Sequence, residues 1–125
     1  MRIVPDHKSD MVAIENLDRA TDEEIINEIY ELLSWLQDIN WPVAVPICEK
    51  IKDLGVPLVE PIEQILNGHD NVWKYWVITN LISKASIEVK KKLKVKLNSI
   101  VSKPTNGEIE EEVNVAATEV LRQCQ

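Results

Sequence analysis

The side chains that carry most catalytic and metal chemistry are few in this chain, and they do not cluster along it. Its two histidines, His7 and His69, both lie outside the H-E-x-x-H spacing that places metal ligands and a base on one helix face. Cys48 falls near the apolar face of a predicted helix, with no histidine nearby in sequence to serve as its base. We therefore expect no catalytic residue, cofactor or metal site.

Glu24, Glu28 and Glu31 share one face of a predicted helix at a spacing that metal ligands also use. No histidine joins them, so a solvated helix face is the favoured interpretation. Trp35 falls on the same face and places a large aromatic ring among the carboxylates. Because protein interfaces are enriched in aromatic anchors ringed by charge, we expect these four residues to bind a partner.

The other tryptophans extend this candidate surface. Trp73 and Trp76 lie on a predicted helix that is apolar over most of its circumference, so either both faces are buried or the indoles contribute to an exposed aromatic patch. We expect Trp41 and Trp76 to be mainly packed, and Trp35 and Trp73 to be more accessible. Asp38 is counted with the partner-binding residues, and its turn-forming character also predicts a structural role together with Asn40.

Five lysines between Lys90 and Lys96 form the one strongly basic segment. The favoured interpretation is a solvated helix face that pairs with the glutamates at 108 and 110–112. The alternative is a patch that binds phosphate or another anionic partner.

Composition limits the class of protein. A chain of 125 residues with 45 % hydrophobic content fits a single helical domain over residues 1–125. The net charge of −7 argues against nucleic acid as a partner and favours a basic protein. There is no apolar run of membrane-spanning length, the first residues do not resemble a signal peptide, and two unpaired cysteines favour a reducing compartment. We expect a cytoplasmic protein with no membrane association.

Local signals predict helices throughout and no strand. Residues 1–9 form an extended arm before a short helix over 10–17, and Thr21 with Glu24 has the capping-box spacing that begins a helix reaching Leu36. The segments from Pro42 and Pro57 share a proline pattern at an offset of 15 and are separated by Gly55. The remaining starts are Asp70 for a helix to about 84, Ser86 for the lysine helix, and Thr105 with Glu108 for the last helix.

Two comparable helix starts, Asn40-Trp41-Pro42 and Asn71-Val72-Trp73, lie 31 residues apart, which is close to the period of helical-hairpin repeats. We therefore expect an all-α fold, a small HEAT-like α-solenoid of antiparallel helical hairpins. A compact, non-repeating helical bundle is the alternative.

Four motifs also resemble a known family. They are Trp35-Leu36-Gln37-Asp38, Asn40-Trp41-Pro42-Val43-Ala44, Trp73-Lys74-Tyr75-Trp76 and Glu110-Glu111-Glu112-Val113. The chain resembles the uncharacterised bacterial family catalogued as domain of unknown function 5071 from Pro5 to Leu121. The resemblance implies an all-helical, HEAT-like fold and no established activity.

These observations favour a non-enzymatic protein-interaction module, most concretely a toxin-neutralising protein of the immunity type. That specific role rests on analogy with small acidic bacterial proteins that block basic toxins. The alternative is a HEAT-like enzyme acting on nucleic acid, which would need a basic groove with a carboxylate among aromatic residues, or an anion binder using the Lys90 to Lys96 face.

Overall fold

The computed structural model describes residues 1–124, and within that range every regular element is helical. The α-helices are α1 (Met11–Arg19), α2 (Asp22–Asn27), α3 (Ile29–Ser34), α4 (Ala44–Ile51), α5 (Val59–Leu66), α6 (Asn71–Asn80), α7 (Ile87–Ser102), α8 (Asn106–Glu110) and α9 (Val113–Arg122). Two short 3₁₀ segments, η1 (Val56–Leu58) and η2 (Ile82–Lys84), precede α5 and follow α6. The expectation of an all-α fold is confirmed.

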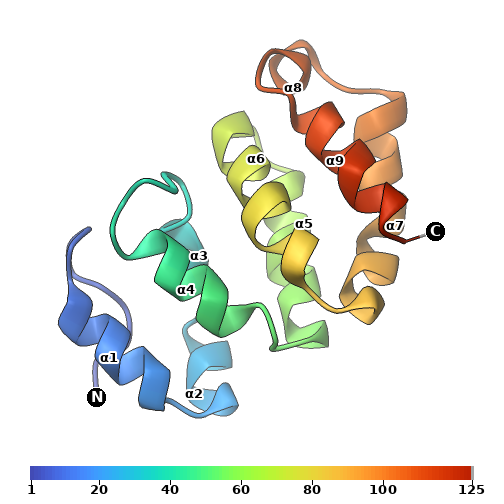
Figure 1. The fold of residues 1–125 in the computed structure, drawn as a ribbon. Coiled ribbons are helices and arrows are strands. Elements are labelled where there is room, and N and C mark those ends of the chain that lie inside the picture. Colours follow the sequence, from blue (N-terminus) through green and yellow to red (C-terminus); the bar gives the residue numbers. More distant parts are fainter. Residues whose placement is uncertain (125) are drawn as a thin grey trace.

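The helices follow one another across the molecule in approximately the order of the chain (Figure 1). Helix α1 packs against α4, α5 against both α6 and α7, and α6 against α9. The most extensive helix contact is between α7 and α9. Neighbours in space are therefore mostly helices that are one or two hairpins apart in sequence.

The predicted helix starts are confirmed by their caps. Asp10, Thr21, Asp70, Ser86 and Thr105 each accept a hydrogen bond from a backbone N–H in the first turn of the following helix. Thr21 and Thr105 form complete capping boxes with a glutamate three residues later. Since isolated helices shorter than about 12 residues are marginal in water, these short helices depend on caps and packing.

Two of the expected continuous helices are broken. The helix predicted from Thr21 to Leu36 is divided at Glu28, whose ψ of 16° interrupts the regular backbone between α2 and α3. The last helix is divided at Glu112, which adopts a left-handed φ of 60° between α8 and α9. The breaks rotate side chains relative to a continuous helix. Tyr30 and Ile109, which helical spacing without a break would place on the apolar face, are each 51 % exposed.

The two proline-containing helices are present, but each begins two residues later than predicted, at Ala44 and at Val59. Pro46 and Pro61 each occupy the third position of α4 and α5, where a backbone N–H has no acceptor within the helix. Gly55, between the two helices, has a φ of 79° that side-chain-bearing residues rarely adopt. Helix α6, expected to reach about residue 84, ends at Asn80 and continues as η2.

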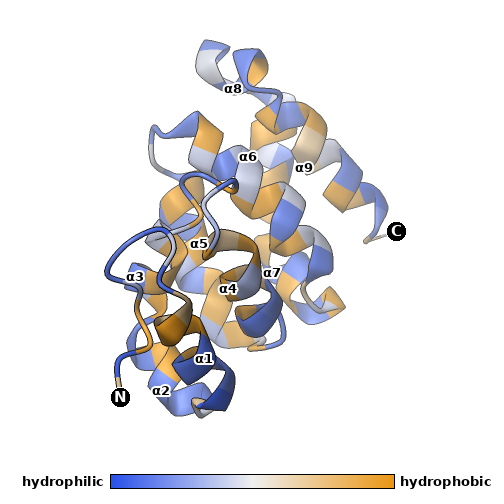
Figure 2. Cartoon of the chain, turned by 60° about the vertical axis from the view of Figure 1, so that its left-hand side comes forward, coloured by the Kyte–Doolittle hydropathy of each residue, from blue (hydrophilic) through white to orange (hydrophobic). Residues whose placement is uncertain are grey.

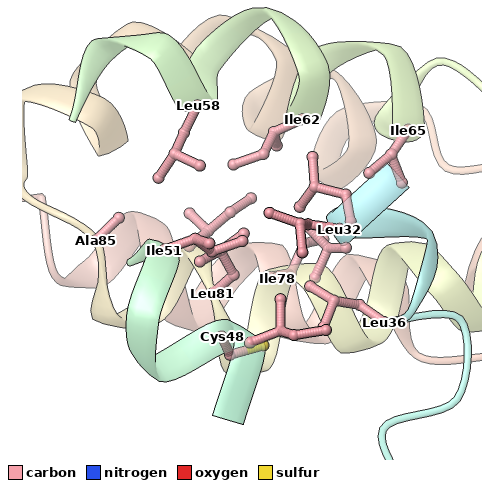
Figure 3. Close-up of a cluster of buried hydrophobic side chains, with 14 of the residues drawn as sticks. Leu32, Leu36, Cys48, Ile51, Leu58, Ile62, Ile65, Ile78, Leu81 and Ala85 are labelled. Atoms are coloured by element: carbon pink, nitrogen blue, oxygen red, sulfur yellow. The ribbon is translucent and has the colours of Figure 1, made fainter. Parts of the chain in front are cut away.

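The hydrophobic core lies between these helices. Apolar residues line the faces that the helices turn toward one another, whereas hydrophilic residues cover much of the outside (Figure 2). Near the middle of the chain, Leu32, Cys48, Ile62 and Ile78 from four different helices lie within one cluster (Figure 3). Four successive helices are therefore joined by a single core.

The N-terminal arm lacks helix, as expected, and lies against the rest of the molecule. Ile3 is only 5 % exposed, and the Lys8 carbonyl accepts a hydrogen bond of 3.1 Å from the Val43 N–H. Asp10 organises the arm because its carboxylate accepts hydrogen bonds from the Arg2 side chain, from the Asp6 N–H and from the Ala13 N–H. The Arg2 hydrogen bond and the backbone donors hold the pKa of Asp10 at about 2, below its ordinary value.

This lowered pKa predicts how stability changes in acid. Asp10 favours the folded state while it is ionised, so its contribution is complete above the unfolded-state pKa of about 4 and disappears as the pH falls toward 2. Urea denaturation of the wild type and of Asp10→Asn should show a constant stability difference above about pH 5 that narrows between pH 4 and 2. A difference that is independent of pH would contradict the proposed role of the carboxylate.

A buried ion pair joins α6 to α8. The Lys74 Nζ lies 3.2 Å from the Glu108 Oε2, and the two side chains are 5 % and 6 % exposed. The other oxygen of Glu108 accepts the Thr105 N–H at 2.8 Å. Burial raises the pKa of Glu108, but hydrogen bonds from the Thr105 backbone and from Lys74 outweigh it and leave the pKa below its ordinary value.

Breaking this pair from one side should be costly. Lys74→Met and Glu108→Gln should each lower the free energy of unfolding by roughly 3–5 kcal/mol, because each leaves an unpaired buried charge. The glutamine keeps an oxygen for the capping box, so it tests the pair itself. In urea denaturation, the double variant should lose clearly less than the sum of the two singles. Additive losses would show that the two charges do not stabilise each other.

Candidate protein-binding surface

The structure separates the residues that were expected to form one binding surface. Glu24 on α2, Glu28 at the break between the helices and Glu31 on α3 are all exposed. Glu24 is partly used in the fold, since its Oε1 accepts hydrogen bonds from the Thr21 N–H and hydroxyl, which lower its pKa. Glu24 and Glu28 also line a hollow of about 300 Å³ together with the first residues of the arm. These carboxylates therefore border the N-terminal arm.

Trp35 is not the exposed anchor that helical spacing predicted. It is half-buried against the core at the end of α3, and its ring meets Trp41 edge to face, with centroids 5.4 Å apart. The break at Glu28 turns α3 relative to α2, so Trp35 no longer shares a face with Glu24. The two indoles pack together at the corner before α4.

Asp38 stabilises the same corner. Its Oδ1 accepts the Asn40 N–H at 2.9 Å, and its carbonyl accepts the Trp41 N–H at 3.1 Å. This is the turn geometry expected of an aspartate side chain that bonds the backbone two residues later. Asp38 therefore acts as a turn residue in the structure, as its sequence context predicted.

Trp73 ties two helices together. Its indole N–H donates a hydrogen bond of 3.1 Å to the Leu33 carbonyl, joining α6 to α3, and the side chain is half-buried. All four tryptophans are half-buried, so the structure does not show the expected division into packed and more accessible indoles. The polar edge of Trp73 is satisfied by an acceptor from a neighbouring helix. Its ring also borders an apolar hollow of about 190 Å³ with Tyr30 and Pro61.

Trp76 lies in a hollow that combines aromatic and acidic side chains, which we name the acid–aromatic hollow. It has a volume of about 290 Å³ and is lined by Val72, Tyr75 and Trp76 from α6 and by Glu110, Glu111 and Glu112 from the end of α8 and the following turn. Tyr75 and Trp76 meet edge to face, with centroids 5.2 Å apart. Trp76 is half-buried like the other three tryptophans, and part of it lines this open hollow.

The charge of the acid–aromatic hollow is uncompensated. None of its three glutamates makes an ion pair within the part of the chain that the structure describes. Sequence reasoning had paired these glutamates with the lysines of α7, and that pairing is wrong. Glu108, the fourth glutamate that was expected to pair with those lysines, forms an ion pair with Lys74. Carboxylates beside the faces and edges of aromatic rings can bind a cationic side chain through both charge and cation–π attraction.

The lysines of α7 are distributed around the helix. Lys91, Lys92 and Lys94 are exposed, Lys96 is half-buried, and Lys90, expected outside, is only 8 % exposed. The long aliphatic stem of lysine can cover apolar surface in such a position. The basic segment is therefore not one continuous face.

Cys48 is buried in surroundings that lower the reactivity of its thiol. Burial raises the pKa of Cys48 to about 12, so its thiol is protonated at neutral pH and is a poor nucleophile. Within residues 1–124 no three His, Cys, Asp or Glu side chains gather in a way that could hold a metal ion. In the same range no helix is long and apolar enough to cross a membrane.

Sequence reasoning missed three residues at three places. Tyr30 lies beside the apolar hollow at Trp73, Tyr75 lines the acid–aromatic hollow, and Lys74 forms the buried pair with Glu108. Helical spacing in a continuous helix places both tyrosines on apolar faces, and nothing in the spacing marks Lys74.

One signal of the acid–aromatic hollow was present in the sequence. Glu110, Glu111 and Glu112 are three consecutive acidic residues, which is more negative charge than capping a helix requires. Their position beside aromatic residues of α6 depends on tertiary packing.

Comparison with known proteins identifies a family. A search of curated proteins finds no match to the chain. The profile of a family described as a domain of unknown function, DUF5071, matches residues 3–121. Because the match covers nearly the whole chain, the protein belongs to the DUF5071 family.

Proposed function

We propose that this chain is a non-catalytic protein-interaction module that binds a basic protein partner in the cytosol. The observation that carries the proposal is the acid–aromatic hollow, where Tyr75 and Trp76 lie beside three unpaired glutamates. We also propose that the hairpins form a small HEAT-like solenoid. The progression of helices in chain order across the molecule supports this assignment (Figure 1).

The hollow has the chemistry to receive a lysine or arginine side chain. A guanidinium or ammonium group over an aromatic face gains about 0.5–2 kcal/mol, depending on how far it is desolvated. Arginine adds bidentate hydrogen bonds to carboxylates. Since no basic residue within residues 1–124 pairs with Glu110, Glu111 or Glu112, a partner would not have to displace an existing ion pair.

The overall charge supports the same kind of partner. A net charge of −7 attracts a basic protein over a distance of roughly 10 Å at 0.1 M salt and raises the rate of encounter. The exposed glutamates of α2 and α3 contribute to this attraction without belonging to the hollow. A toxin-neutralising role is the most specific form of the proposal, since a basic toxin would be such a partner.

Selection of displayed peptides on the immobilised full chain tests the proposal. We expect the selected peptides to be enriched in lysine or arginine. The triple variant Glu110→Gln, Glu111→Gln, Glu112→Gln should weaken their binding by at least about tenfold, because it removes the charge of the hollow. Fluorescence anisotropy at fixed salt measures the Kd, and thermal unfolding checks that the variant is folded.

A matched variant separates the hollow from general charge. Glu23→Gln, Glu28→Gln, Glu31→Gln changes the net charge by the same amount on exposed positions of α2, α3 and the break between them. It should slow association at low salt and change the Kd by less than about threefold. Equal weakening by both triples, or selected peptides without basic residues, would overturn the assignment to the hollow.

A further inference from the structure

Another hollow, which is basic where the acid–aromatic hollow is acidic, lies where α6 begins, α7 ends and α8 begins. It has a volume of about 370 Å³. The polar residues of its lining include Asn71, Lys74, Lys96, Lys103, Thr105 and Glu108. Three lysines face a single carboxylate in a chain whose net charge is −7. These helix ends lie together at the upper end of the molecule in Figure 1.

Lys74 has unused hydrogen-bonding capacity at this hollow. Its side chain is 5 % exposed, and among the described residues its ammonium group donates to Glu108 alone. An ammonium group has three N–H donors, and a buried donor without an acceptor is costly. The hollow is thus the place from which further acceptor atoms can reach Lys74.

Asn71 adds a complementary requirement. It lines the same hollow, and its Oδ1 is buried without a hydrogen-bond partner. Gly107 packs closely beside its amide nitrogen, and a Cβ atom added to Gly107 would lie 2.3 Å from the Asn71 Nδ2. The oxygen has almost no surface open to the hollow, so a ligand can donate to it only when the Asn71 side chain turns toward the ligand. A ligand that satisfies both residues therefore needs oxygen acceptors for Lys74 and a donor for the turned Asn71 amide.

The remaining lysines define the charge of that ligand. Lys96 and Lys103 reach the hollow from the C-terminal part of α7, and neither forms an ion pair within residues 1–124. The Glu108 carboxylate is already engaged by Lys74 and by the Thr105 N–H, which reduces its repulsion of an anion.

We propose that this hollow binds a small phosphate compound that retains a hydroxyl donor. Phosphate oxygens accept from Lys74, Lys96 and Lys103, and the hydroxyl donates to Asn71. The inference goes beyond the proposed function, because the residues, the charge and the ligand class all differ from those of the acid–aromatic hollow.

Calorimetric titration of the full chain at constant ionic strength tests the inference. The probes are inorganic phosphate, which keeps one hydroxyl at neutral pH, glycerol 3-phosphate, which is a phosphate monoester, and sulfate, which has no donor. We expect both phosphates to bind and to raise the Tm, and sulfate to bind more weakly. Tighter binding of glycerol 3-phosphate would identify the ligand as a monoester, and tighter binding of inorganic phosphate would identify it as the free anion.

Two double variants with equal charge change locate the site. Lys96→Gln with Lys103→Gln should raise the Kd for the preferred phosphate at least about tenfold, which corresponds to about 1.4 kcal/mol. Lys91→Gln with Lys94→Gln removes two exposed lysines of α7 that do not line the hollow, and it should change the Kd by less than about threefold. Thermal unfolding without ligand checks that both variants are folded.

Three results would overturn the inference. They are the absence of phosphate binding at millimolar concentration, equal weakening by the two lysine pairs, and sulfate binding as tight as phosphate. The triple glutamine variant of the acid–aromatic hollow should keep its phosphate affinity. Loss of peptide binding and loss of phosphate binding are therefore separate outcomes.

Discussion

The buried pair of Lys74 and Glu108 is the interaction on which the C-terminal half of this protein depends. Helix α8 has only five residues and cannot hold its position by its own backbone bonds. Glu108 uses one oxygen to cap that helix and the other to hold it against α6. Both hollows follow from this arrangement. Glu110 to Glu112 come to lie beside Tyr75 and Trp76 in the acid–aromatic hollow. Lys74 lines the basic hollow and has N–H donors that Glu108 does not use.

Local sequence signals predicted much of the fold because most of its constraints are local. A capping side chain acts over three residues, and Asp10, Thr21, Asp70, Ser86 and Thr105 all begin helices as expected. Gly55 and the two proline patterns also act within a turn. Where the backbone departs from a continuous helix, at Glu28 and Glu112, no residue type marks the break, and the predicted faces beyond it are misplaced.

The candidate site was harder to predict because its chemistry depends on contacts between distant segments. Lys74 is buried only because Glu108, 34 residues later, compensates its charge. Trp73 is half-buried because a carbonyl of α3 accepts its N–H. Of the residues assigned to partner binding from sequence, Trp76 alone lies in the acid–aromatic hollow, and the three glutamates beside it had been assigned to the lysines of α7.

Because Cys48 is buried, the rate at which its thiol is modified reports how often the surrounding helices open. Thiol-modifying reagents attack the thiolate, and this sulfur is both enclosed by core residues (Figure 3) and held in its protonated form. Its modification therefore has to wait until α4 separates from the surrounding helices, so the rate reports a motion and not the reactivity of the group. Cys124 lies just after α9 and is half-buried. Its modification rate is an internal reference with which the slower rate of Cys48 can be compared.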